Sequence, residues 1–202
     1  MRIALAAALA ALLFPGAAAA KTHRPTCFPP HTKTIATDAK VRVFQTRKVV
    51  EHAHVTYGCL LERKRPVKFL LLDFPTGFGP IALAAPYVAY GDYSDCAASF
   101  CNPNAVVLQD LRGGKGQEVQ GSISVATVDS LVLKPHGSLA FIASTFDPSG
   151  TILPGLSVVK VEHGGTPVVL DSSPGVDGGS LALAGSTLYW TDAGTPMSAP
   201  LD

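Results

Sequence analysis

The sequence has few charged residues and no clear excess of either sign. Lysine and arginine total 16, aspartate and glutamate total 15, and the formal net charge of the 202 residues is +1. One short basic run, Glu62–Arg65, interrupts this balance and is expected to form an exposed hairpin turn. A balanced chain offers little electrostatic attraction to nucleic acid or to an anionic membrane. Neither is therefore expected as a partner.

Beyond its first 20 residues the sequence has no apolar stretch long enough to span a membrane. Residues 1–20 have the features of a secretory signal: Arg2, an apolar run at Ile3–Phe14, and small residues at Ala17–Ala20 before Lys21. The apolar run is shorter than the roughly 20 residues of a transmembrane helix. We therefore predict a cleaved signal peptide and a protein that is secreted, periplasmic or on the cell surface, with no membrane span after cleavage.

The familiar short catalytic motifs are also missing. There is no Gly-x-Ser-x-Gly elbow, no His-Glu-x-x-His pair, no Gly-Lys-Ser/Thr phosphate loop and no paired-cysteine redox motif. His52 and His54 would share one face of a strand and could bind zinc or copper. No nearby cysteine or second histidine pair completes such a site, so a polar loop is the favoured interpretation. No catalytic, cofactor or metal site is predicted.

Only four cysteines are present, a number that allows three disulfide connectivities in an exported protein. Cys96 and Cys101 are close in sequence, and their pairing would close a short loop. This arrangement leaves Cys27 and Cys59 to connect the N-terminal tail to the first repeat. We therefore predict the disulfides Cys96–Cys101 and Cys27–Cys59.

What the sequence does contain is a pattern repeated every fifty residues. Three short alternating segments, Ile81–Leu83, Leu131–Leu133 and Leu181–Leu183, lie in step, and a second apolar run follows each of them. A period of this size indicates an array of one supersecondary unit. The unit is predicted to be all-β, because turn residues recur every eight to twelve positions or so between short strand-like segments.

The second half of each unit is predicted to be a β-hairpin with glycines in its turn. Such turns need the positive φ angles that glycine adopts readily. Each unit is therefore an antiparallel four-stranded meander. Two units, Gly79–Gly121 and Val128–Ser173, have all their strands, whereas the flanking units are expected to be partial.

Two segments resemble known repeats. Val107–Lys115 is similar to a hairpin with Asp, a basic residue and a glycine turn, and Leu131–Ala140 to two strands joined by Pro-x-Gly. Both motifs occur in the WD40-like and TolB-like propeller repeats of exported bacterial proteins. The resemblance implies a small or partial β-propeller at residues 34–202, preceded by an extended lead-in at residues 21–33. The chain is long enough for at most four blades of such a ring.

The expected partial units at the two ends suggest that they share one blade. In that case the strand at Val41–Gln45 would pair beside the strands around Leu188 or Met197, and no sheet edge would remain open. If the ends do not share a blade, the ring stays open, and a homodimer is the expected consequence.

The favoured function is an exported, non-catalytic binding module for an unknown protein or saccharide ligand. A small exported saccharide hydrolase or lyase is the first alternative, and a structural envelope protein is the second. Tyr87, Tyr93 and Trp190 are the candidate ligand contacts, since aromatic rings beside a concave surface can stack on a sugar. Packing between sheets is the competing interpretation for these rings.

Overall fold

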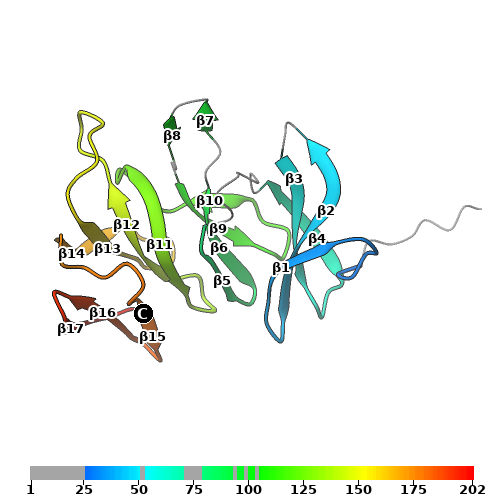
Figure 1. Ribbon diagram of the computed structural model, residues 1–202. Coiled ribbons are helices and arrows are strands. Elements are labelled where there is room, and N and C mark those ends of the chain that lie inside the picture. The colour runs from blue at the N-terminus through cyan, green and yellow to red at the C-terminus, as the bar shows by residue number, and fades with distance from the viewer. Residues whose placement is uncertain (1–25, 51–52, 71–78, 93–94, 98–99, 103–104) are drawn as a thin grey trace, which may run out of the picture.

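The computed structural model describes residues 26–50, 53–70, 79–92, 95–97, 100–102 and 105–202. Within these ranges the chain forms 17 strands and no helix. The strands make four antiparallel sheets that follow one another along the sequence, and a small separate hairpin. Figure 1 shows the sheets following one another in a curved row: the blue N-terminal sheet is at the right, the second in the middle and the third at the left, and the red C-terminal sheet lies below the third.

The first two sheets are four-stranded meanders. In the first, β1 (Lys33–Thr37), β2 (Val41–Val50), β3 (Ala53–Leu60) and β4 (Arg65–Leu70) pair in sequence order. The second sheet has the order β10-β9-β6-β5, and the hairpin β7-β8 is inserted between its two middle strands. The bounds are β5 (Ile81–Ala84), β6 (Tyr87–Asp92), β7 (Asp95–Ala97), β8 (Phe100–Asn102), β9 (Ala105–Asp110) and β10 (Gly116–Glu118).

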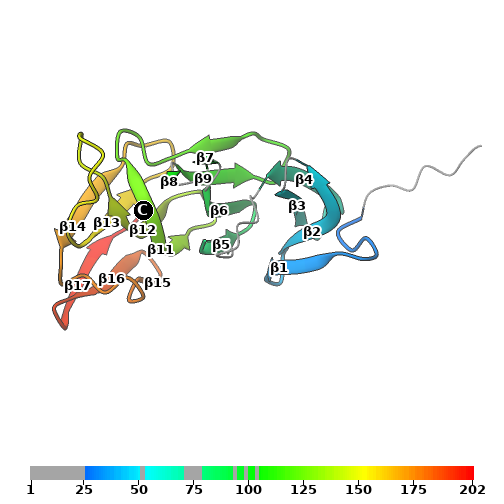
Figure 2. The ribbon, with the colours of Figure 1, turned by 45° about the horizontal axis from the view of Figure 1, so that its top comes forward.

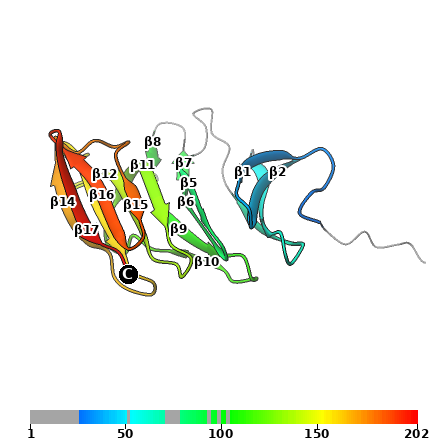
Figure 3. The same cartoon turned by 90° about the horizontal axis from the view of Figure 1, so that it is seen from below.

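The third sheet has four strands, whereas the fourth has three. The third contains β11 (Val125–Leu133), β12 (Leu139–Thr145), β13 (Leu156–Val161) and β14 (Val168–Ser173). The fourth contains β15 (Ala182–Ala184), β16 (Thr187–Asp192) and β17 (Thr195–Pro200). Figures 2 and 3 show the same row of sheets from two other directions.

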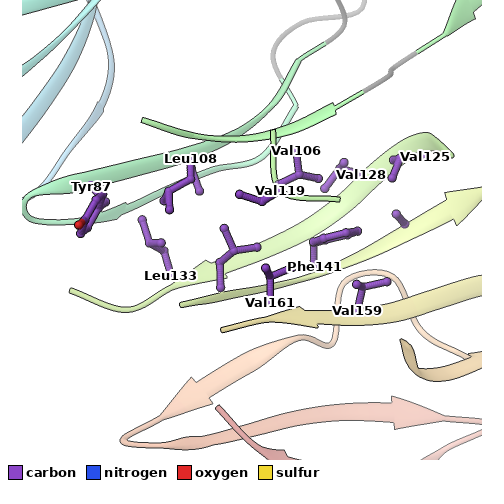
Figure 4. Close-up of a cluster of buried hydrophobic side chains, with 13 residues drawn as sticks. Tyr87, Val106, Leu108, Val119, Val125, Val128, Leu133, Phe141, Val159 and Val161 are labelled. Carbon is purple, nitrogen blue, oxygen red and sulfur yellow. The ribbon is translucent and has the colours of Figure 1, made fainter. Parts of the chain in front are cut away.

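Three apolar clusters hold neighbouring sheets together. One joins the first and second sheets through Val43 and Val88, and another joins the third and fourth through Ile142 and Trp190. The largest lies between the second and third sheets, and Figure 4 shows its side chains, Phe141 among them, between the two layers. The middle sheets therefore bury both faces. This explains why their strands have continuous apolar runs rather than simple alternation.

The predicted succession of antiparallel sheets is confirmed, and two details of the prediction are wrong. The first unit is complete rather than partial, because the polar segment Lys33–Thr37 forms its fourth strand. The ends do not share a blade, because Val41–Gln45 pairs with β1 and β3 of its own sheet. The C-terminal strands β15, β16 and β17 form a separate sheet of their own. The first and fourth sheets lie at opposite ends of the row (Figure 1).

The predicted Cys27–Cys59 disulfide is present, with its Cα atoms 5.5 Å apart. It attaches the start of the described chain to β3. Cys96 and Cys101 are directly opposite each other in the β7-β8 pairing. Their disulfide stays a prediction, and the register of the hairpin is the one it requires.

Candidate functional site

Two of the three aromatic residues proposed as ligand contacts are buried between sheets. Trp190 is 4% exposed, and its indole Nε1–H donates to Asp171 Oδ2 over 2.8 Å. Tyr87 is 8% exposed and packs in the largest core cluster. Both rings therefore act as packing anchors, and the ligand-contact interpretation is wrong for them. Tyr93 and His52 lie outside the described residues. Next to the buried Trp190 in the sequence, Tyr189 has an exposed ring.

No metal site emerges from the described part of the chain. It contains no group of three or more histidine, cysteine, aspartate or glutamate side chains placed to hold an ion. His54 is held at the start of β3, where its Nδ1–H donates to the carbonyl oxygen of Thr46 over 3.2 Å.

The most distinctive polar surface lies where turns of the first two sheets meet. Two adjoining cavities, of about 380 and 710 Å³, share Arg63 and Arg112 in their walls. We call them together the basic groove. Its walls come from the β1-β2, β3-β4, β5-β6 and β9-β10 turns and the start of β4. The lining residues are Ala39, Lys40, Leu60, Leu61, Glu62, Arg63, Arg65, Pro66, Val67, Ala85, Pro86, Leu111, Arg112 and Gly113.

Local backbone geometry presents the arginines at this groove. In the β3-β4 turn the amides of Arg63 and Lys64 both donate to the carbonyl oxygen of Leu60, over 3.1 and 3.0 Å. In the β9-β10 turn Gly113 has a φ of 115°, a conformation that favours glycine. These two tight turns expose their basic side chains beside each other, because the apolar residues of the strands on either side pack into the cluster between the sheets.

Arg112 is the most firmly held cation of the groove. Its guanidinium donates to both carboxylate oxygens of Asp110 at 2.7–3.0 Å and to the hydroxyl of Tyr87 at 3.0 Å. It also lies 5.4 Å from the centre of the Tyr87 ring. The hydrogen bonds from Arg112 hold the pKa of Asp110 below its ordinary value, and the same pairing raises the pKa of Arg112. Tyr87 thus contributes to the groove from beneath, by orienting a cation.

The groove combines a cationic rim with an apolar floor. Lys40, Arg63, Arg65 and Arg112 line it, and among the lining residues that the structure describes Glu62 is the one carboxylate. The floor is formed by aliphatic side chains and prolines. The sequence indicated only the basic run of the β3-β4 turn. Lys40 comes from another turn of the same sheet and is brought beside this run by strand pairing. Arg112 comes from the second sheet, and the packing of the two sheets brings it there.

No protein-family model matches the sequence, and no curated protein matches it significantly. Within the part of the chain that the structure describes, no helix is long and apolar enough to cross a membrane. Any assignment of function therefore rests on the fold and on the chemistry of the groove.

Proposed function

We propose that this protein is an exported, non-catalytic interaction module that binds an acidic peptide segment of a partner protein in the basic groove. The observation that carries the proposal is the convergence of Lys40, Arg63, Arg65 and Arg112, from separate turns, around an apolar floor. Complementary charges at the rim of such a surface attract and orient a partner. The apolar floor then accepts the uncharged side chains of the bound segment.

A peptide fits this surface better than a saccharide does. Protein sites that bind sugars commonly offer exposed aromatic rings, and the groove offers Leu60, Leu61, Ala85 and Pro86 instead. A glycoside hydrolase needs two carboxyl groups on either side of the scissile bond. Here Glu62 lines the groove, while Asp110 is engaged by Arg112. These features favour binding over saccharide hydrolysis.

Export is part of the same proposal. The Cys27–Cys59 disulfide is compatible with an oxidising, extracytoplasmic location. The composition of residues 1–20 supports a signal peptide ahead of this domain. The first and second sheets share a packed apolar cluster, so that their turns can form one surface with little reorganisation on binding.

The test is a binding titration with a synthetic peptide of alternating glutamate and leucine, followed by fluorescence anisotropy. We expect saturable binding that weakens as ionic strength rises from 0.1 M towards 1 M, because the screening length falls from about 10 to about 3 Å. The double variant Arg63→Glu/Arg65→Glu should bind about tenfold more weakly or worse.

Two controls make the result specific. Lys48→Glu reverses an exposed charge outside the groove and should bind like the unaltered protein. A peptide of alternating glutamine and leucine should bind poorly. Equal binding of both peptides, or equal weakening by Lys48→Glu and by the double variant, would contradict the proposal. Binding of an acidic polysaccharide in preference to the peptide would contradict the choice of partner.

A further inference from the structure

A second cavity, of about 330 Å³, lies at the edge of the first sheet, and it shares no lining residue with the basic groove. Its described lining residues include His31, Lys33, Gln45, Arg47 and His54, and no carboxylate is among them. It is thus a small, basic, polar cavity at the lower end of the size range for small-molecule sites.

Gln45 is the unusual residue of this cavity. Its side chain is 4% exposed, and its amide Nε2 has no hydrogen-bond partner. Buried polar groups in folded proteins almost always have a partner, so each exception calls for an explanation. Gln45 lies opposite Lys33 on β1 and opposite Thr56 on β3. Since directly opposite residues share a sheet face, the unpaired amide and the Lys33 side chain project on the same side.

An irregularity in β2 forms the other wall. The β2-β3 pairing is regular as far as Gln45 and Thr56, and then shifts register before Val49 and His54. Because β2 has more residues than β3 across this shift, Thr46, Arg47 and Lys48 leave the regular ladder. Bulges of this kind re-aim side chains and are frequent beside functional sites. Here Arg47 lines the cavity, and His54 is anchored to the carbonyl oxygen of Thr46.

The remaining wall comes from the segment before β1. His31 adopts a φ of 59°, which is uncommon outside glycine, and so turns the chain immediately before Lys33. The segment is held in place by the Cys27–Cys59 disulfide and by hydrogen bonds from Arg42 to Thr32 and Thr34. The cavity is therefore built on elements that are fixed independently of any ligand.

We infer that this cavity binds a small oxyanion, the carboxylate or phosphate group of a small molecule. Such a group supplies the acceptor that Gln45 Nε2 lacks, and its negative charge complements Lys33 and Arg47. The planar guanidinium of arginine can donate two parallel hydrogen bonds to either group. This anion site is separate from the proposed peptide groove, and the inference does not depend on peptide binding there.

The test is an NMR titration of the mature protein with sodium acetate and, separately, with inorganic phosphate, with sodium chloride as the ionic-strength reference. We expect a saturable shift of the Gln45 side-chain amide resonances with at least one of the two anions. The anion that saturates the shift at the lower concentration shows whether the site prefers a carboxylate or a phosphate group. No saturable shift with either anion would overturn the inference.

Variants separate binding from folding. Arg47→Gln should weaken the binding of the saturating anion by about tenfold or more, since it removes a charge-assisted contact. Gln45→Met removes the amide donor and should also weaken binding, while its melting temperature without anion equals or exceeds that of the unaltered protein. Lys68→Gln removes an exposed cation elsewhere on the same sheet and should leave binding unchanged. An equal loss in Lys68→Gln and Arg47→Gln would show general charge attraction and would overturn the inference.

Discussion

The two end sheets of the row differ in how their outward faces are covered. The outward face of the first sheet contains Arg42, Phe44 and Cys59, and the segment that begins at Cys27 lies over it. The outward face of the fourth sheet contains Ala182, Tyr189 and Ser198, which are in register across its three strands and exposed. One end of the row is therefore closed by the chain itself, and the other is open among the described residues.

Arg42 shows how the covered face is stabilised. Its side chain is 7% exposed and donates to the carbonyl oxygen of Cys27 and to the hydroxyl of Thr34. The guanidinium carbon lies 4.8 Å from the ring centres of both Phe28 and Phe44. Burial lowers the pKa of Arg42, and the hydrogen bonds and ring contacts offset that desolvation.

The open face has a different composition. It has no charged side chain in register on its strands, and Tyr189 is 45% exposed. The outer edge strand, β17, contains Pro196 and Pro200. Asp192 and Thr195 flank a two-residue turn, which fixes which residues of β17 donate to β16. The nitrogens of Pro196 and Pro200 fall at the alternate positions and point away from β16. Of the three residues of this edge whose nitrogens point outward, only Ser198 retains a donor, so the edge is poorly suited to an added strand and the flat face is the better contact surface.

The largest effect is expected from the contact between the third and fourth sheets. Trp190→Ala should lower the free energy of unfolding by about 3–5 kcal/mol, because it leaves a cavity in the cluster and leaves Asp171 without its indole donor. Urea denaturation followed by circular dichroism would measure this change. Tyr189→Ala is the matched control on the opposite face and should change stability by less than about 0.5 kcal/mol. Similar losses in both variants would show that the two faces do not differ.

The disulfide of the first sheet is expected to rank second. Replacing Cys27 and Cys59 together by serine should cost about 2–4 kcal/mol, because the constraint on the unfolded chain is lost. Hydrogen exchange should show faster exchange mainly in β1 to β4. Replacing Cys96 and Cys101 by serine should cost less, since these residues close a much shorter loop in a hairpin outside the main sheets. A uniform loss of protection across all four sheets would contradict a local role for the covering segment.

Arg42→Met should have a smaller effect, about 1.5–3 kcal/mol, because it removes charge-assisted hydrogen bonds but retains much of the apolar side chain. Differential scanning calorimetry would measure the loss. Lys48→Met, at an exposed position on the same strand, should be nearly neutral. An unchanged melting temperature for Arg42→Met would show that the disulfide alone holds the covering segment.

Acidification should weaken the attachment of the fourth sheet slightly. Burial acts to raise the pKa of Glu162, but hydrogen bonds from Lys160 and the Asp202 amide outweigh it, and the pKa lies below its ordinary value. A carboxylate with a depressed folded pKa stabilises above its unfolded pKa, and this stability is lost as the pH falls through the folded value. Since the group is partly exposed, the effect should be below about 1 kcal/mol. Thermal melts of Glu162→Gln should therefore depend less steeply on pH below neutrality than those of the unaltered protein. The same pH dependence in the two proteins would show that Glu162 does not contribute to stability in this way.

The difference between the end sheets also shows what could be predicted from sequence. The strands around Leu131 and Leu139 were predictable, because their apolar residues face the neighbouring sheets. The strand at Lys33–Thr37 was not, since its polar side chains are exposed and only Ile35 and Ala36 are partly buried, which leaves no strong pattern. That one strand makes the first sheet complete and removes the reason for ring closure. A short edge strand is specified mainly by backbone pairing, which leaves little trace in side-chain type.

The two candidate sites were harder to predict for a related reason. Only the run around Arg63 was visible in the sequence, whereas Lys40 joins it through strand pairing within the first sheet and Arg112 through the packing of two sheets. The unpaired amide of Gln45 is visible only when its burial and its partners are known. Periodicity reports which residues face a core. It does not report which turns from different sheets end beside one another.

Substitutions on the open face of the fourth sheet should have the smallest effect on stability. They are expected to change self-association instead. An exposed, uncharged face that no described segment covers predicts that the protein self-associates through the fourth sheet as its concentration rises. Tyr189→Lys should leave the melting temperature unchanged and shift the molecular mass from light scattering towards that of the monomer, because a charge would be buried at the centre of the contact. Val168→Lys makes a similar change at an exposed position of the third sheet and should leave association unchanged. Equal dissociation by both variants would indicate general charge repulsion. A protein that stays monomeric at every concentration would show that small side chains and an edge with prolines are enough to keep an uncovered sheet face in contact with water.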